Sequence, residues 1–298
     1  ELLSRALMQC AMLAHGSRYT GNLETSSQHG WKAWQLVKVC MGRKRVHTIP
    51  ALAQTLVSSL ELLAYYYIGT SDFFKCRTIV SQAYHIYVNH KQYLADSTAH
   101  RVLGLMIGAS CSLDDTEFWL AKAKALNLQA STPFETSGWV VLALMLSSNM
   151  IGIADRDILP LRPKQMQERE FTHKIAVLHV IDESEKAVVF FELTPMCIAD
   201  PHSQKVCKVH KAVLDGCRAL ILWQCGFEKE AVTYVNRVLA AGKPDNTSRL
   251  PHLLALAYST QVARCLNQRL AFNKGIEFLE DGIYSYAYIR LLWEELKK

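Results

Sequence analysis

The sequence is poor in glycine, proline and clustered cysteine, and it has no long apolar run. Fourteen Gly and eight Pro in 298 residues exclude a collagen-like or linker-dominated chain. Nine scattered cysteines, the closest being Cys217 and Cys225, exclude a disulfide scaffold and favour reduced thiols. The uncharged, mostly apolar stretch from Gly138 to Ala154 is shorter than the roughly 20 residues of a membrane-spanning helix. We therefore expect no membrane span and interpret this stretch as a buried helix.

The excess of positive over negative charge is also small. Lys and Arg total 33 against 27 Asp and Glu, so the formal net charge is only +6. The one tight basic run, Arg43-Lys44-Arg45, fits a solvated loop better than a targeting signal or phosphate contact. A nucleic-acid groove is normally more basic and more clustered, so we expect no direct nucleic-acid contact. The start at Glu1, with no secretory signal, predicts a piece of a nuclear or cytoplasmic protein.

Common metal and catalytic motifs are missing as well. No C-x2-C pair occurs, and Cys207 with His210, one helical turn apart, looks like a core cysteine beside a surface histidine. There is no G-x-S-x-G and no glycine-rich phosphate loop. Asp155 and Asp157 fit a structural loop better than an acid–base pair. We expect no metal and no cofactor; catalytic residues are unknown, and an enzyme is less expected than a non-enzyme.

What the sequence does contain is helical periodicity. Half of the residues are hydrophobic and the mean hydropathy is +0.04, which is typical of a globular protein with a large core. Apolar residues at i, i+3 and i+4 predict helices over 1–15, 27–41, 50–69, from about 72, 97–110, 115–127, 135–150, 164–180, 203–225, 228–241, 250–267 and 270–296. The short apolar run at 187–191 suits either a strand or a buried helix.

This pattern predicts an all-α fold: a single large multi-helix domain whose helices pack as irregular antiparallel pairs. No strong composition break divides the chain, and the best candidate boundary is the segment 151–163. We expect a helical body over 1–160 and a C-terminal helical continuation of the same domain over 161–298. The second part is a candidate half of a ligand pocket.

One stretch resembles a known family. The run ETSGWVVLALMLSSNMIGIADRDILP places, in order, Glu135, Trp139, Ser147 and Ser148, Ile153, Asp157 and Pro160. This order resembles the signature of the fungal-specific transcription factor domain, the middle homology region of zinc binuclear cluster regulators. Just upstream, AKAKALNL at 121–128 is similar to a helix end of that family, with Asn127 where the family has Gly.

The chain departs from the family at charged positions. Thr136 and Ser137 stand where the family has basic residues, and Met145 stands where it has an aspartate. Losing one partner of a buried ion pair costs about 3–5 kcal/mol, so loss of both together is physically easier. We expect Glu135, Trp139 and Pro160 to support the fold.

The resemblance implies an effector-sensing regulatory domain. Such a domain binds a small apolar ligand or metabolite, pairs as a homodimer or with a coregulator protein, and leaves DNA reading to a separate Cys-rich zinc cluster. The alternatives are a repurposed enzyme acting on an apolar secondary metabolite and a helical protein-interaction scaffold. Aromatic size and expected burial suggest these residues as ligand-binding: Tyr66, Trp139, Trp223, Tyr258 and Trp293.

Overall fold

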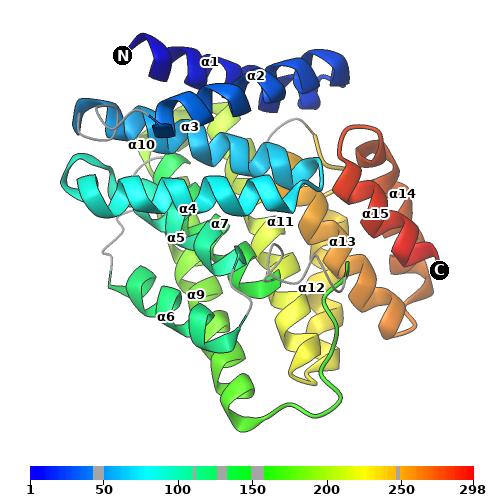
Figure 1. Ribbon diagram of the computed structural model, residues 1–298. Helices are drawn as coiled ribbons and strands as arrows, with labels where there is room; N and C mark the ends of the chain where they lie inside the picture. Colours follow the sequence, from blue (N-terminus) through cyan, green and yellow to red (C-terminus); the bar gives the residue numbers. More distant parts are fainter. Residues whose placement is uncertain (43–49, 110–111, 126–132, 149–157, 246–248) are drawn as a thin grey trace.

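The computed structural model describes residues 1–42, 50–109, 112–125, 133–148, 158–245 and 249–298. These residues form helices without any strand, which confirms the all-α prediction (Figure 1). The elements are α1 (Leu2–Tyr19), α2 (Leu23–Gly42), α3 (Pro50–Gly69), α4 (Phe73–His90), η2 (Lys91–Tyr93), α5 (Asp96–Ala109), α6 (Leu113–Lys124), α7 (Pro133–Ser148), α9 (Glu168–Glu192), α10 (Pro195–Ala199), α11 (Pro201–Gln224), α12 (Glu228–Ala240), α13 (Arg249–Cys265), α14 (Arg269–Ile283) and α15 (Ala287–Lys297).

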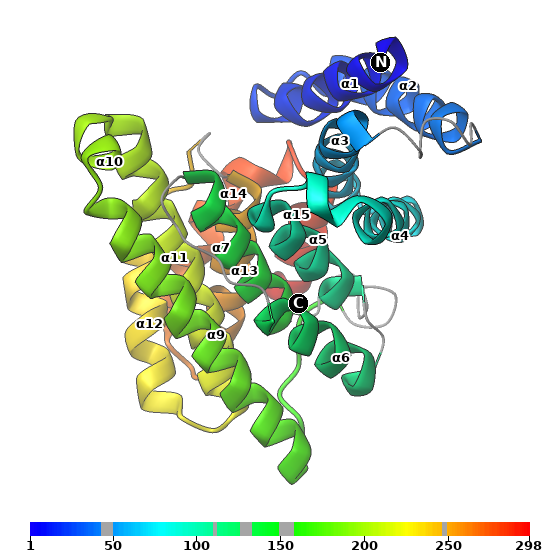
Figure 2. The same ribbon diagram turned by 90° about the vertical axis from the view of Figure 1, so that its left-hand side faces the viewer.

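The helices pack in one domain, mostly against neighbours in the chain. The pairs α1 with α2, α3 with α4, α11 with α12 and α13 with α14 are such neighbours. Figure 2 shows α1 to α4 on one side of the molecule and α9 to α12 on the other, with α5, α7 and α13 between them. The central helices α5 and α7 pack on each other, and α11 contacts α7, α9 and α13.

Helix α7 contains most of the uncharged stretch that we interpreted as a buried helix. Every side chain from Val140 to Ser148 is buried, and the helix contacts α5, α9, α11 and α13. A helix that is apolar on all faces needs neighbours on all faces. Helix α7 therefore lies at the centre of the domain, and the interpretation as a buried helix is confirmed for the described part of the run, 138–148.

Two predicted helices differ clearly from the structure. Residues 168–180 and 187–191 belong to one helix, α9, which begins after a capping box formed by Gln167 and Glu170. The helix predicted over 270–296 is two helices, because the chain turns at Tyr284 to Tyr286. A Cβ on Gly282 would lie 2.8 Å from the Leu253 side chain, so α14 approaches α13 closely just before this turn.

Polar side chains cap two helices near the centre of the chain. Asp72 accepts a hydrogen bond from the Lys75 backbone N–H at 3.1 Å and caps α4. At α6 the cap is Ser112, whose hydroxyl accepts from the Asp115 N–H at 3.2 Å, and Asp114 and Asp115 lie in the first turn. There they face the positive end of the helix dipole.

The cysteines described by the structure are free thiols. Most are buried or half-buried, and Cys265 is exposed. The sulfur atoms of Cys197 and Cys207 lie 3.7 Å apart, where α10 meets α11. These residues therefore act as small core side chains in this fold.

Candidate ligand-binding cavity

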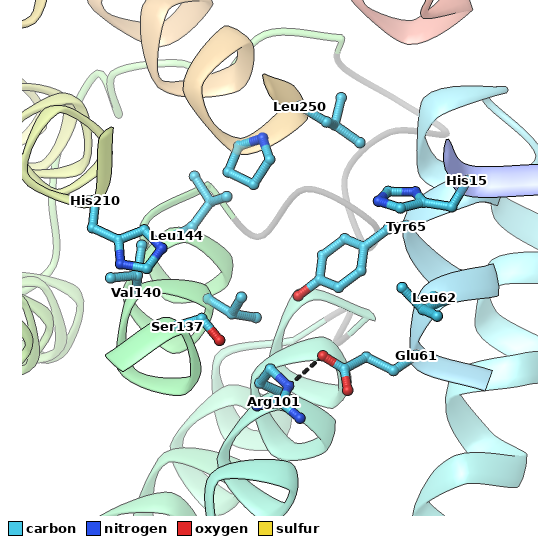
Figure 3. Close-up of a pocket in the computed structure, with 12 residues that line it drawn as sticks. His15, Glu61, Leu62, Tyr65, Arg101, Ser137, Val140, Leu144, His210 and Leu250 are labelled. Carbon is cyan, nitrogen blue, oxygen red and sulfur yellow. Dashed lines mark hydrogen bonds and ion pairs between the residues drawn. The ribbon is translucent and has the colours of Figure 1, made fainter. Parts of the chain in front are cut away.

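A cavity of about 190 Å³ lies where α1, α3 and α5 face α7, α11 and α13 (Figure 3). We name its two sides by their residues. The polar wall consists of His15, Glu61, Tyr65 and Arg101, and the apolar wall consists of Val140, Val141, Leu144, Leu250 and Pro251. Leu62, Ser137 and His210 complete the lining.

Helix α3 supplies the centre of the polar wall. Glu61 is the only charged residue between Pro50 and Gly69, and Tyr65 follows it by four positions. Residues four apart lie one above the other on a helix, so both side chains reach the same space. Figure 3 shows the Tyr65 hydroxyl pointing toward the middle of the lining residues.

Glu61 and Arg101 form a buried ion pair at the edge of the cavity. The Arg101 Nε donates a hydrogen bond to Glu61 Oε1. The Arg101 side chain is 3% exposed and the Glu61 side chain is 10% exposed. Burial raises the pKa of the Glu61 carboxyl, while the adjacent guanidinium acts in the opposite direction. An unpaired buried guanidinium would be very costly, so the burial of Arg101 depends on the Glu61 carboxyl beside it.

Two histidines line the same cavity. Burial lowers the pKa of His210 to about 4, and burial together with the charge of Arg18 lowers the pKa of His15 to about 4. Both imidazoles are therefore neutral at pH 7. The His210 Nδ1 is buried and has no hydrogen-bond partner among the described residues.

The position of His210 corrects the sequence interpretation. We expected a surface histidine beside Cys207, but only 4% of His210 is exposed. The reason is that α11 has neighbours on several sides, namely α7, α9, α12 and α13. A residue expected to be solvated is thus enclosed at the cavity.

The five aromatic residues predicted to bind a ligand lie outside the lining of this cavity. The guanidinium carbon of Arg18 lies 5.2 Å from the centroid of the Tyr66 ring, and the ring centroids of Trp139 and His100 are 4.9 Å apart. Trp223 and Tyr258 are buried in the core. Trp293 lines a separate open pocket of about 720 Å³, beside Glu280 and Asp281. The aromatic side chain that does line the cavity is Tyr65.

The residues of the family-like stretch occupy several positions. Trp139, Ser147 and Ser148 lie on α7, and Pro160 is buried. Of the three positions that lack the charges of the family, Thr136 and Met145 are fully buried and Ser137 is half-buried. The other residues of this stretch and its upstream helix end lie outside the described residues: 126–128, Ile153, Asp155, Asp157, and the side chain of Glu135. The basic run from Arg43 to Arg45 lies outside them as well.

The lining residues that sequence reasoning missed include the polar residues Glu61, Arg101 and His210. For Glu61 a signal was present, because a lone carboxylate in an apolar helix must find a partner when it is buried. Arg101 is 40 positions away, and only the packing of α3 against α5 brings it to Glu61. No local pattern identifies such a partner.

The chain has no match among protein-family models, curated proteins or solved structures. Within the described residues, no three His, Cys, Asp or Glu side chains converge in a way that could hold a metal ion. None of the described helices has both the length and the apolar character needed to cross a bilayer. The lining of the cavity itself offers apolar side chains, one ion pair and two neutral imidazoles.

Proposed function

We propose that this chain is the effector-sensing domain of a fungal transcription regulator and that a small apolar molecule binds between the polar and apolar walls. The observation that carries the proposal is the cavity itself. It combines an apolar wall with a few polar side chains, which is the usual composition of small-molecule sites. The sequence resemblance supplies the regulatory setting.

The location of the cavity supports a sensing role. Its lining comes from α1, α3 and α5 on one side and from α7, α11 and α13 on the other. A ligand in contact with both sides favours whichever arrangement of these helices fits it best. Such a difference in affinity between two arrangements is what a ligand needs to shift a population. The domain would act in the nucleus or cytoplasm, with a homodimer or coregulator partner and without touching DNA itself.

Two alternatives have their own support. The neutral imidazoles of His15 and His210 could accept protons from a substrate, which favours the enzyme acting on an apolar metabolite. The exposed side chains of Phe190, Leu193 and Ile198 favour the interaction scaffold, because they leave apolar surface uncovered around α9 and α10.

The test joins the chain to an unrelated DNA-binding domain in yeast and measures reporter transcription during a screen of small apolar metabolites. We expect some compounds to change the output and to raise the melting temperature of the purified chain. Leu144→Trp, which fills the cavity from the apolar wall, should abolish both responses, whereas Leu161→Trp, at an exposed leucine, should keep them. Compounds consumed by the purified chain would replace the proposal by the enzyme, and an output that ignores every compound would replace it by the scaffold.

A further inference from the structure

Two buried cysteines are in contact outside the lining of the cavity. The sulfur atoms of Cys197 on α10 and Cys207 on α11 lie 3.7 Å apart, and neither residue has exposed surface. A disulfide bond is about 2.05 Å long, so the two sulfurs need to approach each other by about 1.7 Å. The packing of α10 on α11 therefore already places the two thiols side by side.

The surroundings of the pair favour an uncharged product. Burial and the contact with Cys197 raise the pKa of the Cys207 thiol to about 12. A metal ion would need the sulfurs as thiolates, which this burial opposes. A disulfide carries no charge, so the same burial does not penalise it.

Helix α10 provides the route by which an oxidant reaches the pair. This helix has only five residues, Pro195–Ala199, and its side chains Met196 and Ile198 are exposed. Short elements with few buried contacts open locally at a low cost in free energy. Helix α11 is held by α7, α9, α12 and α13, so it stays in place when α10 opens. Cys197 is therefore the thiol that meets the oxidant first.

We infer that Cys197 and Cys207 form a reversible disulfide that fixes α10 on α11 under oxidising conditions. The thiolate of Cys197 attacks one sulfur of a small disulfide, such as oxidised glutathione, and releases one thiol. Cys207 then loses its proton, attacks the mixed disulfide and releases the second thiol. The two protons and two electrons of the cysteines thus pass to the two released thiols.

The bond gives α10 two states. In the reduced chain non-covalent contacts hold this helix, and it opens locally. In the oxidised chain a covalent link joins residues ten positions apart and restricts the unfolded chain, which stabilises the folded one. Because neither cysteine lines the cavity, the inference does not rest on the proposed function.

The experiment equilibrates the whole chain at pH 8, without air, in buffers of increasing ratio of oxidised to reduced glutathione. N-ethylmaleimide then blocks the remaining thiols, and the chain is digested with trypsin. Trypsin cleaves after Lys205, between the two cysteines, so mass spectrometry detects the disulfide as peptide 187–205 joined to peptide 206–208. We expect the joined peptides to become the main form as the ratio rises and to separate again in excess reduced glutathione. The oxidised chain should also melt a few degrees higher than the reduced chain.

Two variants assign the bond to this pair. Cys207→Ser should abolish the joined peptides and leave glutathione attached to Cys197. Cys217→Ser is the matched control, because Cys217 is also a fully buried cysteine of α11, and it should form the joined peptides like the unmodified chain. The exposed Cys265 should acquire glutathione in every variant, which shows that the oxidant is active. If Cys207→Ser does not fold, the peptides of the unmodified chain and of Cys217→Ser decide the question.

Three results would overturn the inference. The first is glutathione on Cys265 without any joined peptides, and the second is a joined pair that excess reduced glutathione does not separate. The third is a bond from Cys197 or Cys207 to a different cysteine. These readouts need no ligand, so an unsuccessful metabolite screen does not affect them, and their failure leaves the sensing role standing.

Discussion

Both walls of the cavity contain fully buried residues, but the two walls are stabilised by different physics. The polar wall contains a charged pair, Glu61 and Arg101, that tolerates burial only because each partner compensates the other. The apolar wall, represented by Val140 and Leu144, gains stability in proportion to the area removed from water. The stability lost on mutating the polar wall should depend on pH and on whether one or both partners of the ion pair are replaced. The stability lost on mutating the apolar wall should depend only on the side-chain volume removed.

The largest effect should come from breaking the pair on the polar wall. Arg101→Met leaves the Glu61 carboxylate buried without a partner, which destabilises a protein by about 3–5 kcal/mol. Burial raises the pKa of Glu61 and the Arg101 guanidinium lowers it, so removing Arg101 raises that pKa further in the folded variant, which then loses additional stability as the pH rises. The free-energy difference from the unmodified chain, measured by urea unfolding, should therefore be larger at pH 8 than at pH 5.

Two further variants control this experiment. Replacing both partners, Glu61→Leu with Arg101→Met, should restore stability to within about 1 kcal/mol, since an apolar pair of similar volume often replaces a buried ion pair without loss. Lys75→Met breaks the half-exposed pair with Asp72 and should cost no more than about 1 kcal/mol. A double variant as unstable as Arg101→Met would show that the arginine acts through packing and not through charge.

A smaller effect, without pH dependence, is expected on the apolar wall. Leu144→Ala removes buried methyl groups and enlarges the cavity, which costs about 2–5 kcal/mol. Leu161→Ala, at a leucine that is 59% exposed, should change stability by no more than about 0.5 kcal/mol. Urea unfolding of both variants at pH 5 and pH 8 checks this, and a loss at Leu144 that varies with pH would contradict the contrast between the walls.

The sequence predicted the fold better than the cavity. Helix α7 was predictable because a run that is apolar on every side has a single stable location, the interior. The break between α14 and α15 was missed because the apolar spacing stays in phase across the turn, from Leu279 to Tyr286 and Trp293. The spacing of apolar residues indicates which face of a helix is buried. A short turn that keeps the same face buried does not change this spacing, so the spacing does not reveal the turn.

The cavity was harder to predict because its lining is non-local. Residues from six helices meet there, and aromatic size directed attention to residues such as Trp223 and Tyr258, which fill the core. The useful signal was instead the isolated charge of Glu61 in an apolar helix. Arg101 and His210 reach the cavity only because α3, α5 and α11 pack together in the fold. The spacing of residues within one helix does not predict that packing.

The smallest effect concerns His210, a polar residue next to the apolar wall. Its pKa is lowered from about 6.5 to about 4 in the folded chain, so its contribution to stability is complete above pH 6.5 and is lost as the pH falls toward 4. We expect this residue to account for about 2 kcal/mol of the stability lost between pH 7 and pH 5. His210→Leu should flatten the dependence of the free energy of unfolding on pH by that amount, measured by urea unfolding. His179→Leu, at an exposed histidine, is the control for replacing a histidine by leucine. If the free energy of unfolding changes with pH equally in the unmodified chain and in His210→Leu, His210 can be protonated inside the folded chain. The apolar side of the cavity would then tolerate a charge, and its stability would not depend on side-chain volume alone.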